Sequence, residues 1–163
     1  MGPDPGIMID RTLPDSLKKH LQQITRSPVL QAGDLEEMPL SKGAYVLIIA
    51  IESAFDLTIK TLPSSKISAG FYIYCGNAHG PGGIKARLKR HFSKDKRPHW
   101  HVDHLSLRAY HLWAFAIEGQ DECQLVDTLQ KTHGYTLPVI GFGASDCKIC
   151  KSHLLLWTPE EDG

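Results

Sequence analysis

The stretch of sequence that decides the fold is FYIYCGNAHGPGGIKARLKRHF, residues 71–92. A tyrosine-rich segment leads into a glycine-rich loop, and the loop leads into a strongly basic segment. Side chains alternate along a strand, so Tyr72 and Tyr74 are expected on one face of it. Apolar residues recur every four positions from Ile84 to Phe92, which predicts a helix with one buried stripe. The stretch therefore predicts a strand, a turn and a basic helix in direct succession.

Arg87 and His91 lie four residues apart on the predicted helix, so they share a face, one turn from each other. The planar guanidinium of Arg87 matches the oxygens of a phosphate, although a solvated surface arginine is the plainer interpretation. His91 could move a proton near neutral pH or contact a phosphate. A tyrosine, an arginine and a histidine could thus converge on one cleft, an arrangement that suits chemistry on a phosphodiester.

Further strands and helices predicted along the chain indicate the fold class. Residues 44–51 are almost all apolar, which indicates a central strand covered on both faces. Residues 108–117 are predicted to form a third main strand, and residues 57–60 a short partner strand. Helices are predicted at residues 13–26, 84–94 and 121–132. We therefore expect a small α/β layer of the α+β type, with three central antiparallel strands flanked by helices.

The composition is that of a soluble globular protein, with 163 residues, 42% hydrophobic and 22% charged. No apolar run reaches about 18 residues, so no membrane-spanning helix and no membrane partner are expected. The first ten residues lack the basic and apolar regions of a secretory signal. The sequence therefore predicts a cytoplasmic location, where cysteines stay reduced or bind metal.

A net charge of zero hides a local excess of cations. Between Ile84 and His101, seven Lys or Arg residues accompany a single acid, Asp95. A basic stripe on a neutral protein indicates a polyanionic partner, and Trp100 adds an aromatic surface for a base. A solvated helix face is the plainer alternative. The residues predicted to contact nucleic acid are Lys85, Lys89, Arg90, Lys94, Lys96, Arg97, His99, Trp100 and His101.

Two short motifs on the predicted strands, GAY at residues 43–45 and YCG at residues 74–76, resemble the two signatures of the GIY-YIG nuclease superfamily. Residues 84–88 are similar to its catalytic helix. The segments HWHVDHL at 99–105 and GFGASDCKICKSHL at 141–154 resemble, more narrowly, the Uri-type branch of that superfamily. Domains of this branch are sometimes fused to endonuclease III-like glycosylases. Alanine and cysteine replace isoleucine in the two signatures, at positions expected in the core.

The resemblance implies a metal-dependent endonuclease, with catalytic residues Tyr45, Tyr74, Arg87, His91 and Glu122. Glu122 would hold one Mg²⁺ or Mn²⁺ ion, a role that suits a single carboxylate and several waters. Taken alone, Glu122 could equally be an acid favoured by the dipole at a helix N-terminus. Tyr45 could orient or deprotonate water with help from the metal or Arg87, because an ordinary phenol is a poor base. Either tyrosine could instead be a residue at the core edge.

The resemblance also divides the chain into an N-terminal tail and helical extension at residues 1–40, a nuclease-like domain at 41–157, and a disordered tail at 158–163. It implies a nucleic-acid partner, DNA rather than RNA, and a repair glycosylase as a second partner. Two other interpretations stay open. One is a nucleic-acid-binding module of the same fold that does not cleave. The other is a zinc-stabilised protein-interaction domain, which would leave the basic stripe unexplained.

A histidine cluster follows the basic helix, with His99, His101 and His104 around Asp103. If this segment were a strand, His99 and His101 would point to one side of it. The cluster could be a second metal site, a DNA contact or a structural hydrogen-bond network around Asp103. The structural network that supports the active site is the favoured interpretation.

A Cys/His extension near the C-terminus contains Cys147, Cys150 and His153 at the spacing Cys-x₂-Cys-x₂-His. This spacing indicates structural Zn²⁺ or redox chemistry, and Cys123 or His101 could supply a fourth zinc ligand. The alternative is a set of reduced, buried thiols that behave as small hydrophobes. In either case the extension is expected to pack against the helix that carries the candidate metal-binding glutamate.

Overall fold

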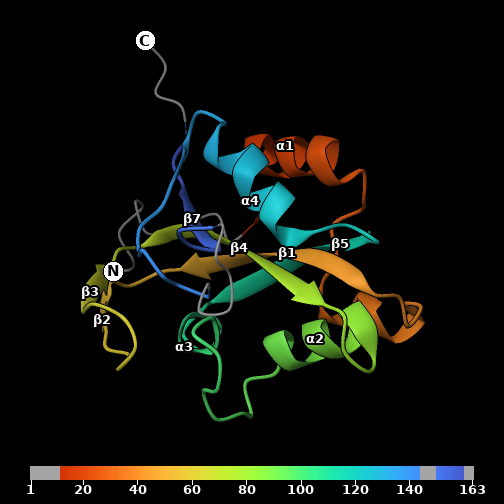
Figure 1. The fold of residues 1–163 in the computed structure, drawn as a ribbon, viewed down its shortest axis with the longest axis horizontal. Helices are drawn as coiled ribbons and strands as arrows, with labels where there is room; N and C mark the ends of the chain where they lie inside the picture. The colour runs from red at the N-terminus through yellow and green to blue at the C-terminus, as the bar shows by residue number, and fades with distance from the viewer. Residues whose placement is uncertain (1–11, 144–149, 160–163) are drawn as a thin grey trace, which may run out of the picture.

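Strand β1 (Gly43–Ile51) forms the middle of the fold, because nearly all of its side chains are apolar and every one of its residues is buried. The structure is a computed structural model, and it describes residues 12–143 and 150–159 (Figure 1). β1 pairs in antiparallel fashion with β4 (Gly70–Ala78) on one side and with β5 (His111–Glu118) on the other. The predicted α+β class and the antiparallel pairing of these three strands are confirmed.

Two short strands extend the sheet beyond the predicted three. β7 (Leu154–Trp157) pairs with β4, and β6 (Tyr135–Thr136) pairs with β7. The described sheet therefore has five antiparallel strands in the order β5-β1-β4-β7-β6. The predicted strand count was too low, because segments of four and two residues carry too little alternation to identify as strands.

A separate two-stranded sheet consists of β2 (Phe55–Leu57) and β3 (Ser65–Ile67). The sequence predicted a short strand at 57–60, so the prediction was displaced by two residues at its start and three at its end. Its partner is also different: β2 pairs with β3 and not with the central sheet. Figure 1 shows this hairpin at one edge of the molecule.

Helices cover both faces of the large sheet. Figure 1 shows α1 and α4 on one face and α2 and α3 on the other. The helices are α1 (Asp15–Thr25), the 3₁₀ helix η2 (Ala32–Glu37), α2 (Gly83–Phe92), α3 (Asp103–Ser106) and α4 (Glu122–Gln130). The three predicted helices correspond to α1, α2 and α4. The segment between α1 and β1 contains η2 and a bridge between Leu30 and Ala114 of β5.

Alternation along β1 divides the core into two layers. Ala44, Val46 and Ile48 pack on the side of α1 and α4, whereas Tyr45 and Leu47 pack on the side of α2 and α3. In the register with β4, Tyr45 is opposite Gly76 and Leu47 is opposite Tyr74. Tyr45 and Tyr74 therefore both belong to the layer beneath the basic helix α2.

The helical part of the predicted N-terminal extension packs into the same core as the sheet. Leu17 and Leu21 of α1 are fully buried in the layer that also holds Phe115 of β5. The predictions for residues 1–10 and for most of the tail at 158–163 lie outside the described residues. No helix in the described part of the chain is long and apolar enough to cross a membrane.

Candidate active site

A cavity of about 280 Å³ opens on the sheet face beneath α2, and seven of its eight lining residues have side chains with polar atoms. Three of the five predicted catalytic residues contribute to it. The residues that line it are Tyr45, Tyr74, Asn77, Arg87, His99, Trp100, His101 and Gly143. The cavity thus gathers side chains from β1, β4, α2 and the irregular segment that precedes α3.

Two glycines make room for the tyrosines of the cavity floor. A Cβ atom on Gly76 would lie 2.3 Å from the ring of Tyr45, which is far inside van der Waals contact. A Cβ atom on Gly143 would lie 2.7 Å from the ring of Tyr74. Gly143 also has φ +66°, a backbone conformation that favours glycine. Both tyrosine rings therefore depend on a glycine packed directly against them.

His91 lies behind Tyr45 and does not line the cavity. Its Nε2 is 2.6 Å from the Tyr45 hydroxyl, and the residue is fully buried. Burial, reinforced by the nearby Lys96 cation, lowers the pKa of His91 to about 3, so the ring is neutral at physiological pH. This position argues against a proton shuttle at His91 and indicates that the ring holds the Tyr45 phenol in place.

The tautomer of His91 decides where the hydroxyl hydrogen of Tyr45 points. Among the described residues, Nδ1 of His91 has no hydrogen-bond partner. A proton on Nδ1 would bury an N–H without an acceptor, whereas a proton on Nε2 can be donated to the phenol oxygen. With Nε2 as the donor, the Tyr45 hydroxyl hydrogen is left to point into the cavity.

Tyr45 and Tyr74 both stay protonated in these surroundings. Burial, with the neighbouring Tyr74 second, raises the pKa of Tyr45 well above its usual value, and Arg87 only partly opposes the shift. Burial also raises the pKa of Tyr74. A general-base role for Tyr45 is therefore not supported by its surroundings, since the phenol stays protonated. It can still donate a hydrogen bond to water or to a phosphate oxygen.

Arg87 lies over the indole of Trp100, with Cζ 4.3 Å from the ring centroid. No carboxylate among the described residues forms an ion pair with it. Its N–H groups therefore stay available to an anion in the cavity, while the ring supports the guanidinium plane. Trp100 was predicted to contact nucleic acid; its position also gives it a structural part in presenting Arg87.

Asp103 organises the segment that carries Trp100. Its Oδ2 accepts hydrogen bonds from the backbone N–H groups of His99 at 2.8 Å and Trp100 at 2.9 Å, and from Arg90 at 2.6 Å. Burial alone would raise the pKa of Asp103, but these hydrogen bonds outweigh it and lower the pKa. The network around Asp103 that was the favoured interpretation of the histidine cluster is present, although the backbone and Arg90, rather than the imidazoles, form it.

The histidines of the cluster have separate surroundings. His99 and His101 line the cavity from an irregular segment and not from a strand. Nδ1 of His101 accepts from the Gly143 backbone N–H at 2.8 Å, and its Nε2 lies 2.9 Å from the Thr61 hydroxyl. Both ring nitrogens of His101 are thus engaged, so it is not the fourth ligand of the Cys/His group.

Several cations of the basic stripe are used inside the protein. The Lys96 side chain is only 4% exposed and bonds to the backbone oxygens of Arg90 and His91 and to the Ser106 hydroxyl. Burial lowers the pKa of Lys96 to about 8, against the opposing effect of Asp103. Lys94 likewise donates to the backbone oxygens of Ser106, the last residue of α3, and of Ala109. The predicted nucleic-acid surface therefore has fewer available cations than the sequence indicates.

Glu122 reaches the site through Asn77. It is the first residue of α4, and its carboxylate accepts a hydrogen bond from the Asn77 side chain, which lines the cavity. Asp121 caps the same helix by accepting from the Cys123 N–H at 3.0 Å. Sequence reasoning missed Asn77. The available signal was a polar residue directly after Gly76, where β4 ends at the cavity.

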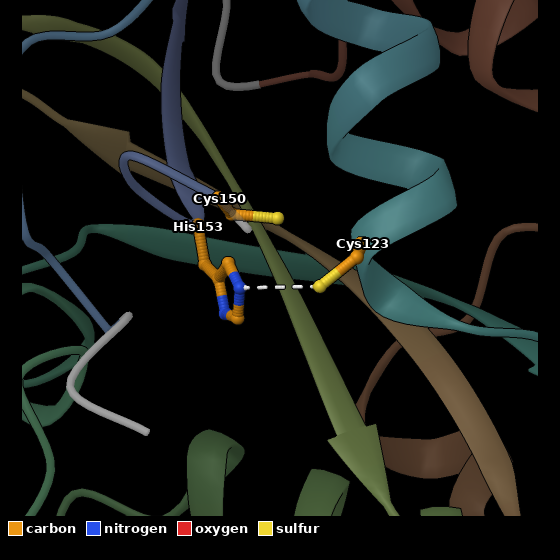
Figure 2. Close-up of side chains that lie close together, drawn as sticks. All are labelled: Cys123, Cys150 and His153. Atoms are coloured by element: carbon orange, nitrogen blue, oxygen red, sulfur yellow. Dashed lines mark hydrogen bonds between the residues drawn. The ribbon is translucent and has the colours of Figure 1, made fainter. Parts of the chain in front are cut away.

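A second group of candidate metal ligands lies beside Glu122. Cys123 of α4 comes together with Cys150 and His153, and their ligand atoms all lie within 4.8 Å of one another (Figure 2). The predicted packing of this part of the tail against α4 is confirmed. Cys147, the remaining predicted ligand, lies outside the described residues. A related set of ligand atoms within the same limit comes from Asp121, Glu122 and Cys123.

Comparison with known proteins gives a family and no further detail. No curated protein and no solved structure matches the chain. One family model, a domain of unknown function named DUF123, matches residues 44–162. That match runs from β1, through the cavity and α4, to the Cys/His extension, and so covers every residue of the candidate site. The protein therefore belongs to the DUF123 family.

Proposed function

We propose that this protein is a metal-dependent endonuclease of the GIY-YIG type, in its Uri-type branch, which hydrolyses phosphodiester bonds in nucleic acid, DNA rather than RNA. One observation carries the proposal. Tyr45, Tyr74 and Arg87, predicted from the two signatures and the basic helix, line one polar cavity. Glu122, 35 positions after Arg87 in the sequence, is hydrogen-bonded to Asn77 at its edge.

The residues present fit a hard divalent cation. Asp121 and Glu122 offer carboxylate oxygens close together, beside the side-chain amide of Asn77. Oxygen ligands of this kind suit Mg²⁺ or Mn²⁺. When bound, such an ion would supply an activated water and relieve negative charge on the phosphate. Glu122 is the residue that would hold it, with Asn77 orienting the carboxylate.

The other residues would bind and orient the substrate. Arg87 would hold the scissile phosphate through its planar fork of N–H donors, with Trp100 fixing that plane. Tyr45 and Tyr74, which stay protonated, would donate hydrogen bonds to a phosphate oxygen or to the attacking water. His91 would keep the Tyr45 phenol in its orientation from behind.

The neighbouring Cys/His group suits a softer ion than the carboxylates do. Two thiolates and an imidazole are preferred ligands of Zn²⁺, which we propose as a structural cofactor here. A closed zinc site needs four ligands, and we propose Cys147 as the fourth.

The test is cleavage of a panel of structured DNA and RNA molecules with Mg²⁺ or Mn²⁺. Glu122→Gln keeps the size of the side chain and should abolish cleavage. Asp127→Asn is the matched control, because Asp127 lies on the exposed side of the same helix and pairs with Lys131. Binding without cleavage under every ion tried would identify the non-catalytic binding module instead. Cleavage that survives Glu122→Gln would show that the cation is held elsewhere.

A further inference from the structure

The Cys/His group joins two parts of the chain that lie far apart in sequence. Sγ of Cys123 is 3.9 Å from Nε2 of His153, thirty positions later. Figure 2 shows Cys123 on α4 facing Cys150 and His153, which lie just before β7. Tetrahedral zinc, with bonds of about 2.3 Å to sulfur and about 2.0 Å to an imidazole nitrogen, places these two ligand atoms roughly 3.6 Å apart. The observed separation is close to that value, so the group needs little rearrangement to close around an ion.

The His153 side of the group is fixed to the sheet. The His153 backbone N–H donates to the Phe142 carbonyl at 2.8 Å, and the His153 carbonyl accepts from the Cys75 N–H of β4 at 3.0 Å. The next residue, Leu154, begins β7, which pairs with β4. His153 therefore cannot shift far without breaking sheet hydrogen bonds, and it provides a firm anchor for a ligand.

The Cys123 side of the group is fixed to the candidate catalytic carboxylate. Cys123 directly follows Glu122 in the first turn of α4, and its N–H is held by the Asp121 side chain at 3.0 Å. A movement of Cys123 must therefore move Glu122, which in turn bonds to Asn77 of β4. An ion between Cys123 and His153 would tie this first turn to the same sheet that carries the cavity.

We infer that a zinc ion held by Cys123, Cys150 and His153 positions Glu122. Zinc binding to the Cys/His group would therefore set the affinity with which Glu122 binds Mg²⁺ or Mn²⁺. The zinc ion does not contact the nucleic acid in this arrangement. Its effect passes through one turn of helix, from the Cys123 sulfur to the Glu122 carboxylate. The role given to Glu122 rests on the proposed function, whereas the presence of the zinc ion does not.

The first measurement is the metal content of the full chain, purified without a histidine tag. We expect one zinc per chain in the wild type and in Glu122→Gln, and none in His153→Gln. His153→Cys replaces one zinc ligand by another and should retain zinc. Cys75→Ala is the control for loss of a buried thiol, because Cys75 lies on β4 outside the metal group. Circular dichroism identifies variants that fail to fold.

The second measurement is binding of Mn²⁺, followed by its electron paramagnetic resonance signal. Loss of a residue that supports a metal ligand typically weakens metal binding by about 10- to 100-fold. We expect a weakening of this size in His153→Gln, near wild-type affinity in His153→Cys, and no change in Cys75→Ala. Chelation of zinc from the folded wild type should lower the Mn²⁺ affinity to that of His153→Gln. This measurement replaces the variant if His153→Gln does not fold.

Each outcome decides the inference separately from the nuclease proposal. Wild-type protein without zinc, or zinc-free protein with unchanged Mn²⁺ affinity, overturns the inference even if nucleic acid is cleaved. Loss of zinc in Glu122→Gln would also overturn it, because the two sites would then be one. Zinc-dependent Mn²⁺ binding in a protein that cleaves nothing would uphold the coupling and reject the nuclease.

Discussion

The Tyr45 phenol and the His91 imidazole form a buried hydrogen bond of 2.6 Å between β1 and α2. Tyr45 is held by a neutral ring, because burial lowers the pKa of His91 to about 3. The stability of the protein should therefore depend on pH, because the pKa of His91 in the unfolded chain is that of an ordinary histidine.

His91 should make the protein less stable as the pH falls below about 6.5. Between that value, the ordinary histidine pKa, and about 3, the unfolded chain binds a proton at His91 that the folded protein does not. The free energy of unfolding should therefore fall by up to about 1.4 kcal/mol per pH unit in this window from His91 alone. Urea titrations at several pH values should show a shallower dependence in His91→Gln, whereas exposed His133→Gln should match the wild type. If the free energy of unfolding varied equally with pH in all three proteins, the lowered pKa of His91 would be contradicted.

Asp103→Asn should destabilise the fold strongly. The carboxylate is fully buried and bonds to Arg90 and to two backbone N–H groups, so its loss leaves Arg90 and Lys96 without their counter-charge. Removal of one partner from a buried ion pair typically costs about 3–5 kcal/mol. Asp95→Asn is the exposed control and should change the free energy of unfolding by less than about 0.5 kcal/mol. Chemical denaturation measures both, and a small effect of Asp103→Asn would show that the network is not structural.

Gly76→Ala should displace Tyr45 although the added group is only a methyl. Its Cβ would sit 2.3 Å from the Tyr45 ring, so either the ring or the strand must move. We expect a loss of about 1–3 kcal/mol in stability, as for overpacked cores, together with loss of cleavage. Gly80→Ala is matched in chemistry, and nothing lies within 4 Å of its Cβ position. Equal effects of the two substitutions on activity and on thermal unfolding would refute the close packing.

Trp100→Leu should weaken the hold on Arg87 without removing the arginine. A cation–π contact of this kind is worth about 1 kcal/mol, which corresponds to a roughly five-fold fall in kcat/KM. Trp100→Phe keeps an aromatic face and should retain most of the activity. If Phe and Leu at this position behaved alike, the indole would act through bulk rather than through its π face. Arg87→Lys should lose far more activity than either, because a point charge cannot replace the planar fork.

Site residues on regular strands and helices could be predicted from the sequence, because the period of the element sets the direction of each side chain. Alternation placed Tyr72 and Tyr74 on one face of β4, and the spacing of four put Arg87 and His91 on α2. Tyr45 was identified from the resemblance of residues 43–45 to a family signature and not from periodicity. The role of Asp103 was harder to predict, because residues 93–102 have no period and their shape depends on backbone N–H groups. The pairing of Cys123 with His153 is a tertiary contact across thirty positions, which spacing alone could only offer among alternatives.

The register that sets Tyr45 opposite Gly76 has a consequence for how this chain tolerates change in length. A shift of β1 by one residue against β4 would turn the phenol towards α4 and bring an aliphatic side chain into the cavity, because a slip of one position exchanges the two faces of a strand. Every side chain needed for the chemistry would still be encoded, and the site would nevertheless be dismantled. Insertions and deletions that preserve the site are therefore confined to the loops, or must occur in pairs within a strand.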